Sequence, residues 1–296
     1  MKPRDAVDLV LLAALWGGSF LFMRVAVPHF GPLPLAALRV AGAALLLLPL
    51  LAMRSGLGSL RQHWRPIALV GITNSALPFL GFSVAALHIG AGLSSILNAT
   101  SPMFGTLIAM VWLREPSSRS RLAGLCIGFV GVVLLASRSS SLAAGPGAGW
   151  AVGLCLAASA LYGFSACFAK RYLQQAQSLA VAAGSQVSAA LVLALPAWWA
   201  RPAHNPPVQP WLAVLALALF CTGVAYVLYF RLIGHIGPAR AITVTFMVPA
   251  FAMLWAGLFL DEAVTTGMLG LCALILLGTG LATGTLRLPL RGRLAE

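Results

Sequence analysis

Residues 91–115 read AGLSSILNATSPMFGTLIAMVWLRE, and the chain repeats the outline of this stretch once more. Residues 238–262 read PARAITVTFMVPAFAMLWAGLFLDE, with a proline, a phenylalanine and a final glutamate at the same places. The tripeptide His-Ile-Gly precedes both stretches, and all these matches are offset by 147 residues. Such self-similarity at a fixed offset is the signature of a repeat architecture. We therefore predict two copies of one unit, spanning residues 5–140 and 149–287.

The composition of the chain indicates an integral membrane protein. Of its 296 residues, 60% are apolar and only 8% are charged, and apolar runs long enough to cross a bilayer recur along the chain. Too few charged residues remain to cover the surface of a soluble protein of this size. We predict an all-α integral membrane fold whose main partner is the lipid bilayer.

Ten membrane spans can be delimited, and five of them fall in each copy. An odd number of spans per copy means that the second copy enters the membrane from the opposite side, so the two copies are inverted repeats. Residues 137–149, rich in Ser, Gly and Ala, are typical of a linker between them. The predicted spans are residues 9–27, 33–53, 64–87, 91–113, 122–136, 150–172, 179–199, 211–233, 238–260 and 266–285.

The basic residues predict the orientation of these spans. With the N-terminus inside, fifteen of the 19 Lys and Arg residues lie on the cytoplasmic side, against Arg138 and Arg201 outside. This asymmetry predicts a multi-pass protein of the inner (plasma) membrane with both termini in the cytoplasm. Arg24 and Arg39 lie inside spans near their outer ends, where we expect the long side chains to reach the interface. Because the basic residues are scattered over short loops, we expect no nucleic-acid partner.

Aromatic and polar side chains indicate one central site. Apart from Phe30, the second, fifth, seventh and tenth spans hold only three aromatic residues, and the other six spans hold the rest. Polar residues occur at matching depth in the third and eighth spans, where an amide must find hydrogen-bond partners. Each such residue could instead only fill or bridge a gap between helices. The candidate substrate-binding residues are Trp16, Ser19, Asn74, Ser75, Phe79, Phe82, Asn98, Tyr162, Ser165, Thr222, Tyr226 and Tyr229.

Glycine and proline residues within the spans predict packing contacts and hinges. Small-residue faces at residues 124–128 and 280–284 favour close packing of the fifth and tenth spans within one chain, and we expect a monomer. A proline inside a span interrupts its hydrogen bonds and offers a place to bend. The candidate hinges are Gly71, Pro78, Pro102 and Pro249.

The reactive side chains argue against an enzyme. All six acids lie at span ends or chain termini, so no buried carboxylate pair is available for acid–base chemistry. The five histidines lie in or beside loops, and the five cysteines lie inside apolar runs without metal-ligand spacing. We expect no catalytic residue, no metal and no cofactor. Because no acid lies at membrane depth, the simplest mechanism is transport that is not coupled to an ion.

The repeated stretches resemble the EamA branch of the drug/metabolite transporter superfamily. Pro102 leads to Glu115, and Pro249 to Glu262, at the fourth span of each copy, and a glycine-rich fifth span follows each time. The resemblance covers nearly the whole chain. It implies ten helices with cytoplasmic termini and a central cavity walled by the first, third, fourth, sixth, eighth and ninth spans. In length and in its aromatic, carboxylate-free interior the chain is most similar to aromatic amino-acid exporters of the YddG type.

These features favour an exporter of small neutral or zwitterionic metabolites, including aromatic amino acids, that works by alternating access. A cavity for organic cations would need a carboxylate, and a cavity for sugar phosphates would need a central Lys or Arg, because an uncompensated buried charge is costly. The sequence predicts neither. An exporter of other metabolites or drugs of the same superfamily, and a scaffold or sensor that does not transport, stay open as alternatives.

Overall fold

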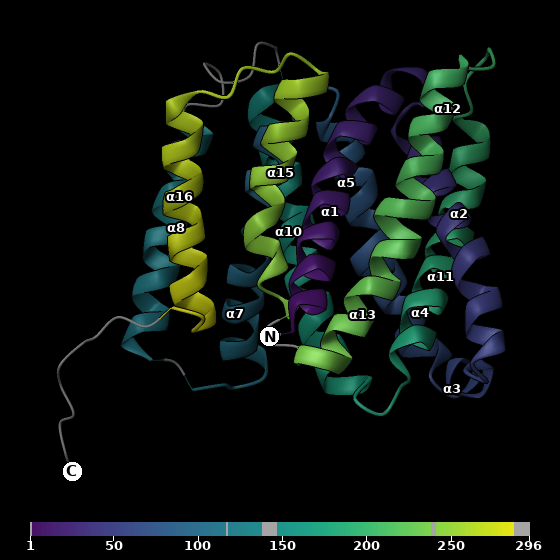
Figure 1. Ribbon diagram of the computed structural model, residues 1–296, viewed down its shortest axis with the longest axis horizontal. Coiled ribbons are helices and arrows are strands. Elements are labelled where there is room, and N and C mark those ends of the chain that lie inside the picture. The colour runs from purple at the N-terminus through teal and green to yellow at the C-terminus, as the bar shows by residue number, and fades with distance from the viewer. Residues whose placement is uncertain (1, 117, 138–146, 238–240, 287–296) are drawn as a thin grey trace.

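All regular structure in the described part of the chain is helical (Figure 1). The computed structural model describes residues 2–116, 118–137, 147–237 and 241–286. The first half contains α1 (Pro3–Phe30), α2 (Pro32–Met53), α3 (Leu57–Gln62), α4 (Trp64–Gly71), the π-helical segment η1 (Ile72–Ala76), α5 (Leu77–Ala85), α6 (Ala91–Asn98), α7 (Ser101–Trp112) and α8 (Arg119–Ser137).

In the described residues the second half follows the same order of spans, with α15 in the place of α6 and α7 and no counterpart of the short α3. Most of the predicted linker, residues 138–146, lies outside the described residues, and so do the predicted unit boundaries at 140 and 287. The helices of this half are α10 (Ala148–Tyr172), α11 (Ser178–Trp199), α12 (Val208–Leu215), the π-helical segment η2 (Ala216–Val224), α13 (Ala225–Ile236), α15 (Val244–Phe259) and α16 (Thr266–Thr283).

The helices form a bundle of membrane length. Three spans consist of consecutive pieces, namely α4 with η1 and α5, α6 with α7, and α12 with η2 and α13. Nine stretches within the described ranges are long and apolar enough to cross a bilayer. The predicted span 238–260 is represented by α15, which has 16 residues, because residues 238–240 lie outside the described part. The prediction of an all-helical integral membrane protein is confirmed.

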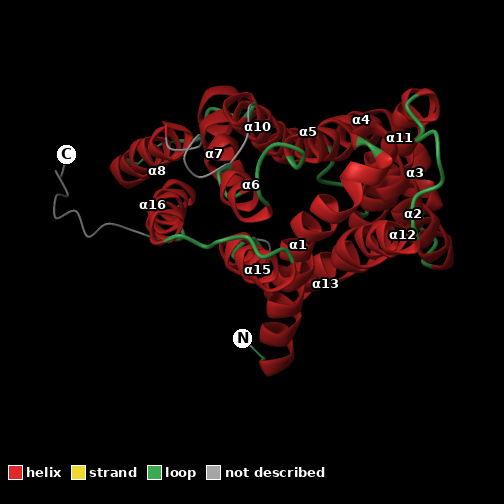
Figure 2. Cartoon of the chain, turned by 90° about the horizontal axis from the view of Figure 1, so that it is seen from above, coloured by secondary structure: helices red, strands yellow, loops and turns green. Residues whose placement is uncertain are grey.

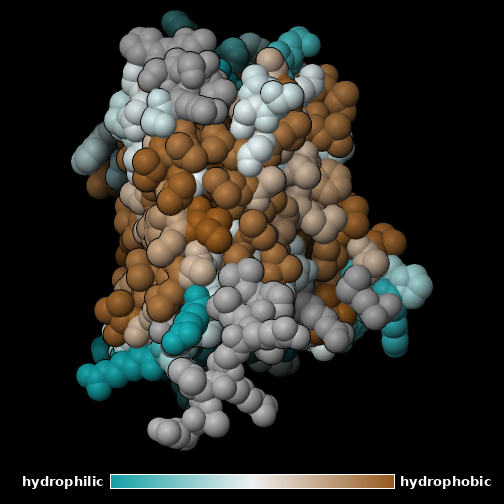
Figure 3. All heavy atoms as spheres, turned by 90° about the vertical axis from the view of Figure 1, so that its left-hand side faces the viewer, coloured by the Kyte–Doolittle hydropathy of each residue, from teal (hydrophilic) through white to brown (hydrophobic). Residues whose placement is uncertain are grey.

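A hydrophobic band covers the middle of the bundle (Figure 3). On the face shown there, apolar residues occupy the centre and hydrophilic residues gather toward the two ends. Large apolar side chains such as Leu45, Val111 and Leu191 point outward, with 75%, 76% and 72% of their surface exposed. Exposure on this scale is unfavourable in water and suits a lipid environment. The surface is therefore that of a multi-pass membrane protein.

The fourth span is broken because Pro102 has no backbone N–H to donate. α6 ends at Asn98 and α7 begins at Ser101. Hydroxyl groups satisfy the carbonyls that the break sets free: Ser101 Oγ donates to Asn98 O at 2.6 Å, and Thr100 Oγ1 donates to Leu97 O at 2.6 Å. Hydroxyls commonly take this part where a helix is interrupted within a membrane. The break therefore leaves neither carbonyl unpaired.

The two π-helical segments occupy equivalent places in the two halves. η1 lies in the third span and η2 in the eighth, and an α-helix continues directly from each. π-helical turns widen a helix locally and occur frequently at functional sites. Asn74 lies in η1 and Thr222 lies in η2. The polar clusters that were predicted at matching depth in the third and eighth spans therefore both lie in π-helical segments.

α8 and α16 pack together along one side of the bundle (Figure 2). A Cβ atom at Gly278 would lie 2.5 Å from Gly128 Cα and 2.9 Å from Gly124 O, so only glycine allows this approach. The predicted packing of the fifth and tenth spans within one chain is confirmed. The contact on α16 includes Gly278 and part of the predicted stretch 280–284: a Cβ atom at Gly124 would lie 2.6 Å from Leu281 Cβ and 2.7 Å from Gly278 O, whereas Gly280 faces Leu286.

Candidate functional site

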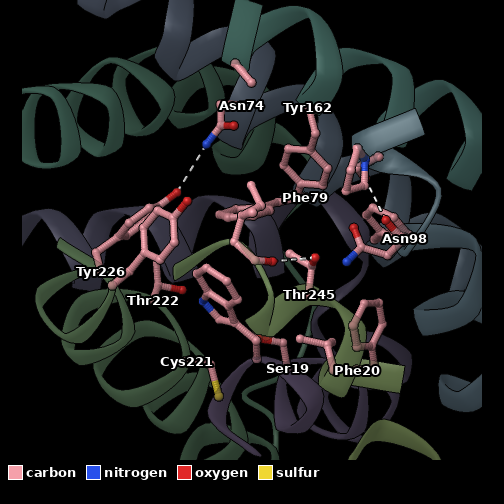
Figure 4. A pocket seen from close by; sticks show the side chains of 18 of the residues that line it. Ser19, Phe20, Asn74, Phe79, Asn98, Tyr162, Cys221, Thr222, Tyr226 and Thr245 are labelled. Carbon is pink, nitrogen blue, oxygen red and sulfur yellow. Dashed lines mark hydrogen bonds between the residues drawn. The ribbon is translucent and has the colours of Figure 1, made fainter. Parts of the chain in front are cut away.

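A cavity of about 290 Å³ lies between helices of both halves (Figure 4). All six spans that the family resemblance implies contribute to its wall, and α2 contributes one further residue. Its described polar side chains carry amides, hydroxyls, an indole N–H, a thiol and a guanidinium, and none of them is an Asp or Glu. The wall consists of Trp16, Ser19, Phe20, Met23, Arg39, Asn74, Phe79, Phe82, Asn98, Ser101, Pro102, Gly105, Tyr162, Gly163, Ala166, Cys221, Thr222, Tyr226, Tyr229, Ile242, Thr245 and Val248.

Aromatic rings from both halves form much of this wall. Phe82 of α5 and Tyr162 of α10 lie nearly parallel, with ring centroids 6.2 Å apart and an interplanar angle of 19°. Phe20 of α1 meets Phe82 edge-on at 5.8 Å and 85°, and Trp16 lies 5.3 Å from Tyr229 of α13. Offset and edge-on contacts of this kind are the favourable geometries for aromatic rings. The cavity therefore offers ring faces and edges to a flat or apolar solute.

Polar groups lie on both sides of the cavity. The Asn74 amide donates to the Tyr226 hydroxyl at 3.2 Å, a contact that joins η1 to α13 (Figure 4). Asn98 and Thr245 lie across the cavity from this pair. Amide groups combine donors with an acceptor, so a solute that has both kinds of group can be held in one orientation.

Arg39 lies in the cavity wall, which corrects the prediction that its side chain reaches the membrane interface. Arg39 is only 6% exposed. Its Nε donates to Thr222 Oγ1 at 3.0 Å, and Nη2 donates to Ser19 Oγ at 3.3 Å. Nη1 lies 3.6 Å from the Met23 sulfur, and Cζ lies 3.8 Å from the centre of the Phe79 ring. The guanidinium is therefore held by both halves at the centre of the site.

The sequence of α2 itself indicates that the Arg39 side chain points into the bundle. Ala36 and Ala43, one turn on either side, are fully buried, and a Cβ atom at Gly42 would lie 2.7 Å from Ala218 Cβ. Small residues mark the face of a membrane helix that packs against its neighbours. A side chain on that face points into the bundle and not toward lipid.

Ten of the twelve candidate substrate-binding residues line the cavity. The exceptions are Ser75, which accepts a hydrogen bond from Gln186 Nε2 of α11 at 2.9 Å, and Ser165, which is buried in α10. Several wall residues were not among the predicted substrate-binding residues. These are Phe20, Met23, Arg39, Ser101, Gly105, Gly163, Ala166, Cys221, Ile242, Thr245 and Val248, with Pro102 named only as a hinge.

The candidate hinges lie at interruptions or close contacts of the helices. Pro78 is the second residue of α5, which follows η1 directly; Pro102 follows the break in the fourth span, and Pro249 lies inside α15. Gly71 packs against α11 so closely that a Cβ atom there would clash with Ser185. Close packing accounts for this glycine, and a hinge role for all four positions stays a prediction.

A carboxylate joins two spans at the end of the bundle away from the N-terminus. Glu262 follows α15 and accepts hydrogen bonds from the backbone N–H groups of Ala91 at 3.1 Å and Gly92 at 3.5 Å. These N–H groups begin α6, where the helix dipole favours a negative charge. Arg24 Nε lies 3.6 Å from the same carboxylate, and Arg24 also donates to Ala86 O. Arg24 therefore pairs with a carboxylate at the end of a span and stays partly exposed.

Ion pairs at the N-terminal end mirror this arrangement. Glu115 follows α7 and contacts Lys170 Nζ at 2.6 Å and Arg121 at 3.9 Å. In the repeat, Glu115 corresponds to Glu262, and Lys170 corresponds to Arg24. The two copies thus place the same charge pair at opposite ends of the bundle.

The N-terminal end of α1 is tied to α13 by two further acids. Asp8 lies 3.4 Å from Arg231, and Asp5 lies 3.1 Å from His235 Nδ1. Both carboxylates are buried, because α1 begins at Pro3 rather than near Leu9 as predicted. They lie in the first turns of the helix and not beside the cavity.

The sequence matches the pattern of the EamA-like transporter family twice, over residues 6–137 and 149–284. The chain belongs to the EamA-like transporter family. The transporter YedA of Escherichia coli K12, described as an uncharacterized inner membrane transporter, is 28% identical over 83% of this chain and 79% of its own. The uncharacterized transporter YvbV of Bacillus subtilis is 24% identical, covering 90% of this chain and 88% of its own.

One relative of this EamA-like chain carries a more specific name. A probable terminal-alkyne amino-acid exporter of Streptantibioticus cattleyicolor is 28% identical over 94% of both chains. A solved crystal structure is also similar, with a TM-score of 0.67, 22% identity and coverage of 96% of this chain and 98% of its own. That likeness shows a shared fold. The family and these relatives are transporters, and transporters are not enzymes.

Proposed function

We propose that this chain exports small neutral or zwitterionic metabolites, above all amino acids with aromatic or apolar side chains. The observation that carries the proposal is the composition of the cavity wall. Aromatic rings occur there together with amides and hydroxyls, and no carboxylate among the described residues is placed to bind an organic cation. Stacking of a ring on Trp16 or Tyr162 contributes roughly 0.5–1.5 kcal/mol beyond burial. The same chemistry supports a resemblance to aromatic amino-acid exporters of the YddG type.

The named relative supports an amino-acid substrate. The probable exporter of Streptantibioticus cattleyicolor aligns over 94% of this chain, so the comparison includes every span that lines the cavity. An amino acid combines a donor, an acceptor and an apolar body, which are the groups that the wall can hold. Amino acids are therefore the substrate class that fits the groups of the cavity wall best.

Alternating access is the proposed mechanism. The two units, residues 5–140 and 149–287, are inverted repeats in the inner membrane, with both termini in the cytoplasm. Rocking of one unit against the other would open the cavity first to one side and then to the other. The acid-free wall supports transport that is not coupled to protons, because a proton carrier needs an ionisable group at membrane depth. The protein works as a monomer.

Uptake into liposomes tests this proposal. Purified protein should take up labelled phenylalanine, and unlabelled tryptophan, tyrosine and other neutral amino acids should compete with it. Glucose 6-phosphate and tetraphenylphosphonium, which represent phosphorylated sugars and lipophilic cations, should not compete. Imposed pH and sodium gradients should leave the final distribution of phenylalanine unchanged. Transport restricted to the charged compounds, or no flux of any compound, would contradict the proposal.

A further inference from the structure

Arg39 is a buried cation without an acid partner among the described residues. Four of the carboxylates in the described residues are paired elsewhere, at the ends of the bundle, and Asp261 is exposed in the loop after α15. A buried charge is strongly unfavourable unless it is paired. The acid contacts are Glu262 with Arg24, Glu115 with Lys170 and Arg121, Asp8 with Arg231, and Asp5 with His235.

The contacts of Arg39 hold the guanidinium in place without using all its donors. A guanidinium has five N–H groups in a planar fork. Thr222, Ser19 and the sulfur of Met23 engage one each, and the Phe79 ring covers one face. Two N–H groups thus have no partner among the described side chains, and Arg39 lines the cavity. A carboxylate accepts two parallel N–H bonds from such a fork.

We propose that Arg39 is the binding site for the carboxylate of the transported solute. This inference rests on the proposed function and makes it more specific: the cavity selects amino acids, and other monocarboxylates with a ring or apolar body, over solutes that lack a carboxylate. The bound carboxylate neutralises the buried guanidinium and completes its hydrogen bonds. The apolar body then lies among the rings of Trp16, Phe82 and Tyr162.

A single guanidinium fits a carboxylate better than a phosphate. A phosphate monoester carries a charge of about −1.5 to −2 at neutral pH. Among the described residues Arg39 is the only Lys or Arg in the cavity wall, so about one half to one negative charge of a bound phosphate would stay buried and unpaired. An amino-acid carboxylate matches the single positive charge. The amino group can then lie over an aromatic face, which attracts a cation.

Ligand binding to the unmodified protein gives the first test. Phenylalanine carries both the carboxylate and the amino group, 3-phenylpropionate carries only the carboxylate, and phenylalaninamide carries only the amino group. Thermal unfolding in detergent should shift upward with the first two ligands and not with phenylalaninamide, since a ligand that binds the native state raises Tm. Equal shifts with phenylalanine and phenylalaninamide, or a larger shift with glucose 6-phosphate, would overturn the assignment.

Variants of Arg39 give the second test. Arg39→Gln should raise the KM for phenylalanine uptake at least tenfold and abolish the shift in Tm caused by 3-phenylpropionate. Without ligand it should unfold at the same or a higher temperature, because an uncompensated charge has been removed. Arg39→Lys, which keeps the charge and loses the fork, should retain part of both effects. Arg65→Gln removes a charge from an exposed position and should behave as the unmodified protein.

The two tests separate this inference from the proposed function. If 3-phenylpropionate raises Tm only when Arg39 is present, while no amino acid crosses the membrane, the carboxylate site stands and amino-acid export fails. If phenylalanine is transported equally by the unmodified protein and by Arg39→Gln, export stands and the site fails. If no carboxylate compound shifts the Tm of the unmodified protein, the site is refuted regardless of flux.

Discussion

Asn74 and Tyr226 join the two halves of the chain across the cavity through one hydrogen bond of 3.2 Å. Asn74→Ala removes this contact and an amide that can orient a solute. A hydrogen bond in a protein contributes on the order of 1 kcal/mol, which corresponds to roughly a fivefold change in an equilibrium constant. We expect the KM for phenylalanine uptake by liposomes to rise about fivefold, with the yield of folded protein unchanged.

Asn205→Ala is the matched control for this prediction. Asn205 also accepts a side-chain hydrogen bond, from Trp211 Nε1 at 3.2 Å, but the bond is exposed and does not border the cavity. Its loss should leave phenylalanine uptake unaltered. An unchanged KM in Asn74→Ala, or an equal rise in both variants, would show that the amide does not take part in solute binding.

Residues of the cavity wall could be predicted from the sequence where a suitable residue type also recurred at an equivalent place in the second copy. Trp16 and Tyr162 are aromatic residues at equivalent places in the two copies, and Asn74 belongs to a polar cluster that occurs at the same depth in both copies. Arg39 was misplaced because the prediction considered only its position near the end of a span, although the offset of 147 residues pairs it with Gln186 and small residues flank it on α2. Ser75 was misplaced for the same reason, since it shares the depth of Asn74 and faces α11 instead.

At the scale of elements, hydropathy and length were sufficient to find the spans, because a membrane core demands continuous apolar helices. The π-helical geometry of η1 and η2 could not be predicted, since it depends on how neighbouring helices accommodate an extra residue. The break in the fourth span was predictable from Pro102. That nearby hydroxyls would donate to the freed carbonyls could also be predicted. Which hydroxyl donates to which carbonyl could be seen only in the structure.

The contact between α8 and α16 gives a prediction for stability. Alanine in place of glycine normally favours a helix by about 1 kcal/mol. At Gly278 the added methyl group would meet Gly128 Cα at 2.5 Å, and overpacking against backbone costs about 1–3 kcal/mol. The cost exceeds the gain, so Gly278→Ala should lower the Tm of the detergent-solubilised protein by several degrees. Thermal unfolding followed by circular dichroism measures this change.

Gly270→Ala on the same helix is the control, and it should not lower Tm. No atom lies within 4 Å of a Cβ at this position, so only the helix-favouring effect remains and Tm should stay the same or rise. A stable Gly278→Ala variant would mean that α8 and α16 can move apart without loss. The close backbone contact would then contribute little to the fold.

For the whole molecule, the orientation of the spans can be tested with introduced cysteines. Three spans, α8, α10 and α11, separate Arg119 from Arg201, so these two positions lie on opposite sides of the membrane. In a background without the native cysteines, Arg201→Cys should react with a membrane-impermeant maleimide in intact cells. Arg119→Cys should react only after permeabilisation. Labelling of both in intact cells would refute the cytoplasmic location of the termini and the inverted arrangement of the two units.

The lone positive charge of Arg39 should also make the protein sensitive to transmembrane voltage. A charge that crosses the full potential drop changes its energy by about 2.3 kcal/mol per 100 mV. The charge is present in both the empty and the loaded protein, because a zwitterionic solute adds none. Voltage should therefore accelerate one half of the transport cycle and slow the other, while leaving the final solute gradient unaltered. In liposomes with a potassium diffusion potential, the rate of phenylalanine uptake should change with voltage in the unmodified protein and stay constant in Arg39→Gln.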